Sequence, residues 1–132
     1  MVEIHAFSNQ EDGDRPLSSH FRVREFACQD GSDPVFVAPR LVMVLESLRT
    51  HFDVPVRITS GYRTAAHNAA VGGSPHSQHT RGMAADVVLP GVAPAQVAAF
   101  ARRLMPDWGG VGVYSDFTHI DVRETKADWK GT

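Results

Sequence analysis

Cysteine is almost absent from this 132-residue sequence, because Cys28 is the only one. One thiol forms no intramolecular disulfide and no cysteine-based cluster, so we expect any metal to be bound by His, Asp or Glu. Long apolar runs are also missing, which excludes a membrane-spanning segment. Residues 1–14 lack a basic stretch followed by an apolar one, so we expect synthesis in the cytoplasm without a signal peptide.

The sequence also lacks runs of Lys or Arg, and its formal net charge is -2. Nucleic acid is therefore a poor candidate partner, because phosphate binding requires clustered positive charge. Hydrophobic residues make up 42% and charged residues 21%, which is typical of an ordinary globular chain. The length suits one domain with one core. We expect a monomer with a polar N-terminal segment at 1–20 and the domain proper at 21–132.

Apolar spacing predicts an α+β fold with a small, mainly antiparallel sheet and helices packed beside it. Residues 39–52 predict the clearest helix, with apolar residues three and four apart and a proline at the start. Further helices are predicted at 21–27, 65–71 and 92–105, strands at 56–59, 83–89, 110–114 and 117–122, and loops at 8–20 and 74–82. Trp129, in the charged tail, is expected to pack back on the body.

Two predicted strands contain polar residues that need an explanation. Asp86 interrupts the apolar strand 83–89, where an unpaired carboxylate costs several kcal/mol. His79 precedes it by seven residues across a turn at Gly82, and His119 interrupts the strand 117–122. Two histidines and one carboxylate suit a catalytic zinc ion with a fourth position for water. The alternative is an edge carboxylate and two ordinary loop histidines.

Several spaced motifs carry a family resemblance. The pattern S-x-H-x-x-G-x-A-x-D is matched by Ser77, His79, Gly82, Ala84 and Asp86, and SGYR at 60–63, HN at 67–68, GG at 72–73, GVGVY and THIDVR occur in addition. Over about residues 20–123 the sequence resembles the peptidase M15 family, the D-alanyl-D-alanine carboxypeptidases of peptidoglycan. The resemblance implies a hedgehog/DD-peptidase-like fold and a zinc metallopeptidase acting on the peptidoglycan stem.

The resemblance also implies roles for individual residues. His79, Asp86 and His119 correspond to the zinc ligands, and Asp116, three positions before His119, corresponds to the general base. Asp121 is the competitor, because residues two apart on a strand face the same side, and it either orients His119 or takes the base role itself. The matching arginine, Arg63, binds substrate or stabilises the oxyanion. Ser77 and Tyr62 are further candidates for substrate contact.

Other functions stay open at this point. The hedgehog signalling domain shares the fold and a similar site, so a zinc-binding recognition module without turnover is one alternative. Within the enzyme class, the bond cut is a D-alanine bond, the L-Ala–D-Glu bond or a cross-bridge, by carboxypeptidase or endopeptidase action. An endolysin released to the cell wall through a phage holin or similar lesion is the expected setting. His76 forms a second H-x-x-H pair with His79 but lies outside the family motif.

Overall fold

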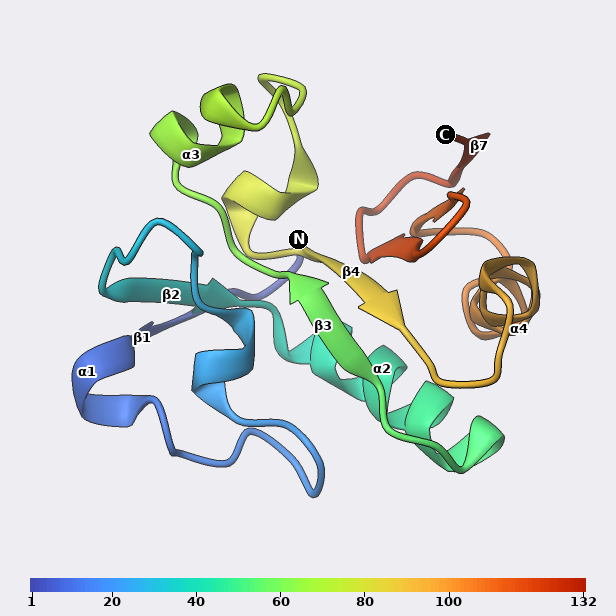
Figure 1. Cartoon of the computed structure of the whole chain (residues 1–132), viewed down its shortest axis with the longest axis horizontal. Helices are drawn as coiled ribbons and strands as arrows, with labels where there is room; N and C mark the ends of the chain where they lie inside the picture. Colours follow the sequence, from blue (N-terminus) through green and yellow to red (C-terminus); the bar gives the residue numbers. More distant parts are fainter.

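Two sheets and four α-helices form the protein in the computed structural model, which describes residues 1–132 (Figure 1). The small antiparallel sheet pairs β1 (His5–Ser8) with β2 (Pro34–Val37). The larger sheet has the order β3 (Arg57–Ser60), β4 (Ala84–Val88), β6 (Thr118–Asp121), β5 (Gly110–Val113) and β7 (Ala127–Lys130). Every pair in it is antiparallel except β5 and β7. The predicted α+β class and mainly antiparallel sheet are confirmed.

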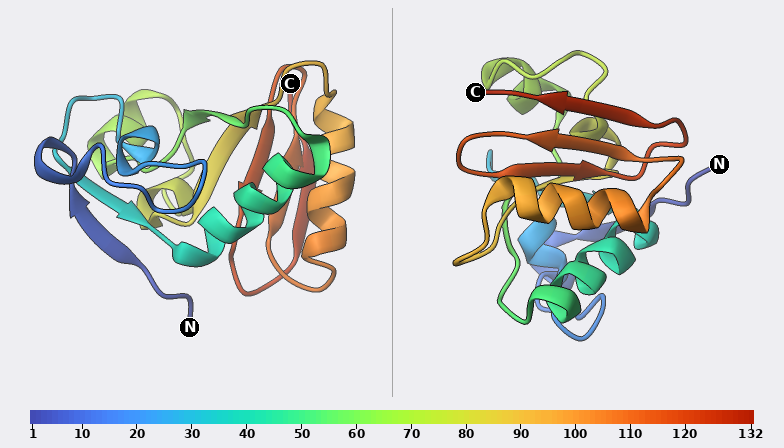
Figure 2. Two further views of the ribbon diagram at one scale, coloured as in Figure 1. Left: turned by 90° about the horizontal axis from the view of Figure 1, so that it is seen from below. Right: turned by 90° about the vertical axis from the view of Figure 1, so that its right-hand side faces the viewer.

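The two long helices supply much of the core. Helix α2 (Pro39–Phe52) begins with a proline in its first turn and ends where Asp53 takes a left-handed conformation. Leu41, Leu45 and Leu48, spaced three and four apart, are fully buried. Helix α4 (Pro94–Leu104) lies along β5 and β6 (Figure 2). Both helices were predicted. None of the helices in the structure combines the length and the apolar character that crossing a membrane requires.

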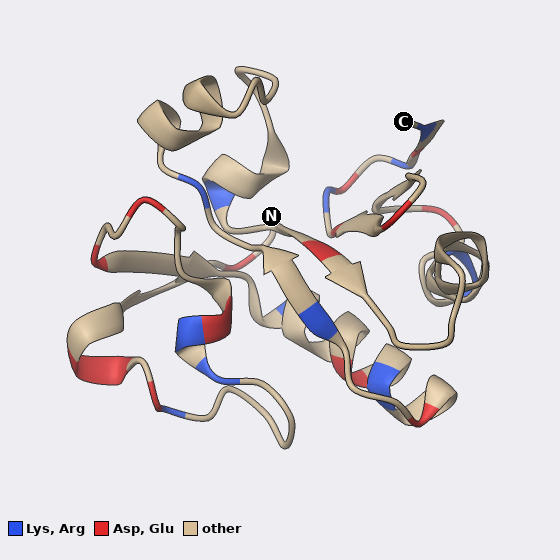
Figure 3. Cartoon of the chain, in the orientation of Figure 1, with Lys and Arg blue, Asp and Glu red and all other residues tan.

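Strands β4 and β6 separate the hydrophobic core from the polar site by simple alternation. Ala85 and Val87 on β4, and Ile120 on β6, belong to the core cluster. Successive side chains of a strand point to opposite faces, so Asp86 and His119 face away from that core. The register pairs Asp86 directly with His119. Figure 3 shows the single acidic position in the otherwise uncharged strand β4.

Several short elements were not predicted. The predicted loop at 8–20 contains the helix α1 (Asn9–Asp12), which begins where the Ser8 hydroxyl accepts a hydrogen bond from the Glu11 backbone N–H. The predicted loop at 74–82 contains the 3₁₀ helix η2 (Gln78–Arg81). The region predicted as a short helix at 21–27 is the 3₁₀ helix η1 (Val23–Phe26), and α3 spans Ala65–Ala70. Such single turns show no apolar periodicity, which explains why the sequence pattern did not reveal α1 and η2.

Candidate metal centre

Three buried side chains bring their ligand atoms together on the polar face of the larger sheet. His79 Nε2 lies 3.2 Å from Asp86 Oδ1, and His119 Nδ1 lies 3.1 Å from the same oxygen. One ligand atom from each residue lies within 4.8 Å of the other two. Asp86 is on an interior strand, so the alternative of a carboxylate at a surface edge is wrong. The three residues singled out in the sequence therefore form one potential metal site.

The backbone around η2 fixes the position of His79. Ser77 caps this turn, and its hydroxyl accepts a hydrogen bond from the His79 backbone N–H at 3.2 Å. Gly82 ends the turn with φ 74°, a conformation that favours glycine. A Cβ at Gly82 would lie 2.4 Å from the Phe36 carbonyl oxygen, so β2 leaves no room for a side chain there. The glycine of the motif is therefore required both by conformation and by the close approach of β2.

Hydrogen bonds on the far side of each ring orient the two imidazoles. His79 Nδ1 lies 2.8 Å from the Gly61 carbonyl oxygen, which only accepts, so Nδ1 carries the hydrogen. His119 Nε2 lies 2.8 Å from Asp121 Oδ2 and donates to that carboxylate. In the neutral rings the free lone pairs are then His79 Nε2 and His119 Nδ1, the atoms that face Asp86. This arrangement fits a metal ion, which binds imidazole through an unprotonated nitrogen.

Asp121 is a fully buried carboxylate held by several donors. Its Oδ1 accepts from the Gly110 N–H at 3.0 Å and from the Arg123 N–H and Nε at 3.1 and 2.9 Å. Its Oδ2 accepts from Arg123 Nη2 at 2.7 Å and from His119. Burial alone would raise the pKa of Asp121, but the bonds from His119 and Arg123 outweigh it and hold the pKa far below its ordinary value. Asp121 is therefore an ionised anchor for His119.

Asp86 and His119 are coupled electrostatically. Burial opposes the charge of Asp86, yet in the metal-free chain His119 and His79 donate hydrogen bonds to it when their facing nitrogens are protonated, and this keeps the pKa of the carboxyl far below its ordinary value. Burial would lower the pKa of His119, but hydrogen bonds to Asp121 and Asp86 raise it. Arg63 Nη2 approaches Asp86 Oδ2 at 3.4 Å. Asp86 is thus the one anionic ligand of the site, and two imidazoles and a guanidinium converge on it.

The three residues open into a polar cleft of about 640 Å³. One side is aromatic: Tyr114 and Phe117 stack with their ring centroids 4.3 Å apart, and Trp129 Nε1 donates to the Tyr114 hydroxyl at 2.9 Å. The Trp129 ring lies 4.9 Å from that of His119. A Cβ at Gly112 would lie 2.5 Å from the Trp129 ring, so this glycine admits the indole. The prediction that Trp129 packs back on the body is confirmed.

A comparison with protein families decides the classification. The family model described as Peptidase M15 matches residues 19–121, which is more than half of the chain. The chain belongs to the peptidase M15 family. Members of M15 are metallopeptidases, so the chain is a peptidase that acts on peptide substrates, and its His-Asp-His group is a potential metal site. None of the curated proteins matches this M15 chain.

The other predicted site residues of the M15 chain differ in their placement. Arg63 and Ser77 line the cleft with the three potential ligands. Tyr62 does not line it but packs edge-on against Phe36, with ring centroids 5.1 Å apart, and burial raises its pKa. Asp116 is exposed in the turn between β5 and β6, outside the cleft lining.

The sequence reasoning missed three contributors to the M15 site. Arg123 holds Asp121, Trp129 contacts His119, and Gly110 leaves space for Asp121, since a Cβ there would lie 2.2 Å from Asp121 Oδ2. The alternating glycines of GVGVY and the arginine of THIDVR were the available signals. Both were noticed only as parts of a resemblance, because the contact of Gly110 lies across strands and the pairing of Arg123 with Asp121 depends on the buried position of that carboxylate.

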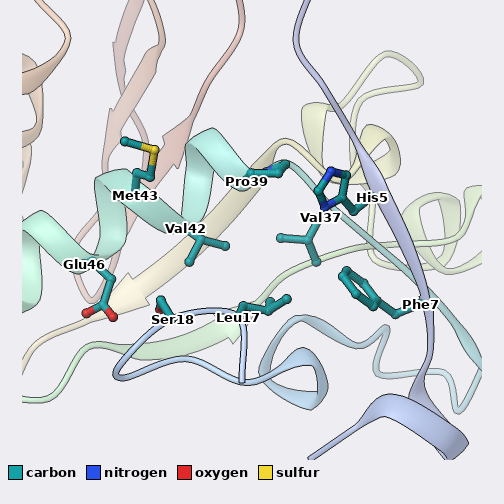
Figure 4. A pocket seen from close by; sticks show the side chains of 9 residues that line it. All are labelled: His5, Phe7, Leu17, Ser18, Val37, Pro39, Val42, Met43 and Glu46. Atoms are coloured by element: carbon teal, nitrogen blue, oxygen red, sulfur yellow. The ribbon is translucent and has the colours of Figure 1, made fainter. Parts of the chain in front are cut away.

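A second hollow, of about 410 Å³, lies between β1, β2 and the start of α2 (Figure 4). Its lining is mainly apolar and shares no residue with the cleft: it consists of His5, Phe7, Leu17, Ser18, Val37, Pro39, Val42, Met43 and Glu46. It lacks a converging group of metal ligands. The chemistry of an M15 peptidase therefore belongs to the polar cleft.

Proposed function

We propose that the chain is a zinc peptidase that hydrolyses the stem peptide of bacterial peptidoglycan at a bond involving D-alanine. The observation that carries this proposal is the convergence of His79, Asp86 and His119 in a protein of the M15 family. Two imidazoles and one carboxylate form a three-ligand set that suits zinc and leaves a fourth position open, as catalytic zinc sites do. A zinc ion there would supply Lewis-acid polarisation of a carbonyl and ionisation of water near neutral pH.

In this proposal Arg63 binds a substrate carboxylate or stabilises the oxyanion. It donates from Nε to Ser60 Oγ at 3.1 Å and from Nη1 to Asn68 Oδ1 at 3.2 Å, so its guanidinium is fixed in direction. Its Nη2 reaches Asp86 Oδ2, the oxygen that the two imidazoles leave free. A fixed guanidinium in the cleft is suited to a substrate carboxylate or to the negative charge that develops on a carbonyl oxygen.

The charge of the cleft supports an acidic peptide as substrate. Arg63, Arg81, Arg123 and His76 line it, whereas Asp86 is its only acidic lining residue. Peptidoglycan stems carry free carboxylates on their D-residues, and basic side chains bind these groups well. The aromatic side made by Tyr114, Phe117 and Trp129 offers apolar contact for small side chains such as the methyl group of alanine.

The general base remains a choice between two carboxylates. Asp121 has both oxygens occupied and a lowered pKa, which suits an orienting residue and makes it a weak proton acceptor. Asp116 immediately precedes Phe117, which lines the cleft. The Asp116 carboxylate takes part in no hydrogen bond or ion pair in the structure. We therefore propose Asp116 as the base.

Muropeptide analysis tests this proposal. Purified protein with zinc is incubated with peptidoglycan, and mass spectrometry is expected to reveal a new free amine or released D-alanine. Asp116→Ala is expected to keep its zinc and to reduce hydrolysis by about 100-fold or more, the range of general base catalysis. Asp107→Ala, an exposed aspartate outside the cleft, is the matched control and should retain full activity.

Each contrary outcome has a specific meaning. Products cut at L-Ala–D-Glu or in a cross-bridge would move the bond while keeping the enzyme class. Zinc binding with no new amine or D-alanine would reject hydrolysis of the stem and favour a recognition module. Hydrolysis that survives Asp116→Ala but disappears in Asp121→Ala, with zinc retained, would reassign the base.

A further inference from the structure

A second group of metal-ligand side chains lies outside the cleft, where the segment after η1 meets the start of α3. Cys28 and Asp30 come from that segment, and His67 comes from the helix. One ligand atom from each lies within 4.8 Å of the other two, the same limit met by the group in the cleft. None of the three lines the cleft. The structure therefore contains two separate clusters of convergent donors.

Thr64 ties this second group together. Its backbone N–H donates to Cys28 Sγ at 3.4 Å, and its hydroxyl donates to Asp30 Oδ2 at 2.8 Å. The same hydroxyl accepts from the His67 backbone N–H at 3.1 Å. Hydrogen bonds from Ser32 and Thr64 hold the pKa of Asp30 far below its ordinary value, so this carboxylate is ionised at neutral pH. Thr64 thus holds the thiol and the carboxylate directly and fixes the backbone of His67 beside them before any ion binds.

We propose that Cys28, Asp30 and His67 form a second metal site, which takes a divalent ion of borderline softness such as zinc or cobalt. One sulfur, one nitrogen and one oxygen ligand favour such ions over magnesium and calcium, which prefer oxygen alone. Cys28 is buried while Asp30 is exposed, so the site opens to solvent on one side for a fourth ligand. Binding converts the Cys28 thiol to a thiolate and releases its proton to solvent.

This site goes beyond the expectation that the chain binds metal only through His, Asp or Glu. It is also independent of the proposed function, because it shares no ligand with the cleft. Its place in the fold suggests a bracing effect: Thr64 follows Arg63 directly, and an ion would clamp residues 28–30 to the first turn of α3. Ion binding at this site is therefore expected to raise the thermal unfolding midpoint in addition to the effect of the cleft ion.

Cobalt titration distinguishes the two sites, because only the second contains sulfur. Reduced, metal-free protein is titrated with Co²⁺ while the near-ultraviolet and visible spectra are recorded. We expect two equivalents to bind, one of them producing a thiolate-to-cobalt charge-transfer band. Cys28 is the only cysteine, so a band from a single chain must come from it. The band should disappear in Cys28→Ser and weaken strongly in His67→Ala, while the visible bands of the cleft ion persist.

A variant of the cleft completes the design. The double variant His79→Ala/His119→Ala is expected to lose one equivalent of cobalt and all hydrolysis, yet to keep the charge-transfer band. Folding of each variant is checked by circular dichroism, and Asp30→Asn gives a third, conservative test of the same ligand set. Absence of the band in folded wild-type protein that binds one equivalent would overturn the second site. A band whose molar absorption per chain rises with protein concentration would overturn it as well, because the ion would then be shared between chains. A band that survives both His67→Ala and Asp30→Asn would have the same consequence.

Discussion

Asp121→Asn is the substitution that tests the metal centre most directly, because it changes hydrogen bonding while preserving shape. The asparagine oxygen can replace Oδ1 and keep the three donors from Gly110 and Arg123. Its amide nitrogen then takes the place of Oδ2, which now lies 2.8 Å from His119 Nε2 and 2.7 Å from Arg123 Nη2. An amide N–H donates to Nε2, and this places the His119 proton on Nδ1, the atom that faces Asp86.

The expected magnitudes follow from those contacts. Loss of an orienting partner of this kind lowers metal affinity by about 10–100-fold, or about 1.4–2.7 kcal/mol. In the variant the asparagine N–H and the Arg123 Nη2–H face each other as two donors, which lowers the free energy of unfolding by about 1–2 kcal/mol. This is the lower end of the range for a buried pair, because the Arg123 side chain is 28% exposed. Zinc affinity should therefore fall clearly while the protein stays folded.

Competition with a chromophoric chelator measures the affinity, and thermal unfolding of the metal-free chain measures the stability. Asp128→Asn is the matched control, because Asp128 also pairs with an arginine, Arg102 at 2.8 Å, but lies in β7 away from the ligands. Unchanged zinc affinity in folded Asp121→Asn would refute the orienting role. Unchanged affinity together with loss of hydrolysis at saturating zinc would identify Asp121 as the base.

Three further results are expected. The raised pKa of His119 in the metal-free chain stabilises the fold below about pH 6.5, and this contribution is lost as pH rises through the folded-state pKa. Calorimetry should therefore show that the thermal unfolding midpoint of the metal-free chain falls above about pH 6.5. Zinc-loaded protein should gain stability over the same range, because zinc requires neutral imidazole. Gly82→Ala should lower the free energy of unfolding, measured with denaturant, by about 2–5 kcal/mol, because of left-handed strain and the clash with Phe36. Gly72→Ala is the control: its φ is 75° but the space around it is open, so the loss should be only about 1–2 kcal/mol. Trp129→Leu should raise KM for the proposed peptidoglycan substrate and change zinc affinity by less than about tenfold, the equivalent of one aromatic contact. A larger loss of zinc affinity would show that Trp129 mainly supports His119.

Local patterns predicted the parts of the fold whose causes are local. Helix α2 followed from apolar residues spaced along one face, and the strand β4 followed from an apolar run. Asp86 was identifiable because a carboxylate inside such a run needs a partner, and His79 lies only seven residues away across η2. His119 lies 33 positions after Asp86 in another strand, so its assignment required the family motif in addition.

Long-range pairing accounts for what the sequence did not reveal. Strand β1 is ordered by β2, and β7 by β5, with Ala127 opposite Gly110. These short strands carry no alternation strong enough to be recognised alone. The contact of Trp129 with His119 depends on that parallel pairing and on the space left by Gly112, so neither residue signals it by itself. The base assignment to Asp116 likewise stays a prediction.

Because Asp86 pairs directly with His119, an ion bound by both residues would require the native alignment of β4 and β6. A slip of one residue between β4 and β6 would bring Asp86 opposite Thr118 or Ile120 and turn His119 toward the helices. No ion could then bridge the two strands, so only the native alignment gains the free energy of metal binding. A folding intermediate with shifted strands would remain at a disadvantage whenever zinc is present. The ion of the proposed peptidase site would thereby also select the correctly assembled sheet.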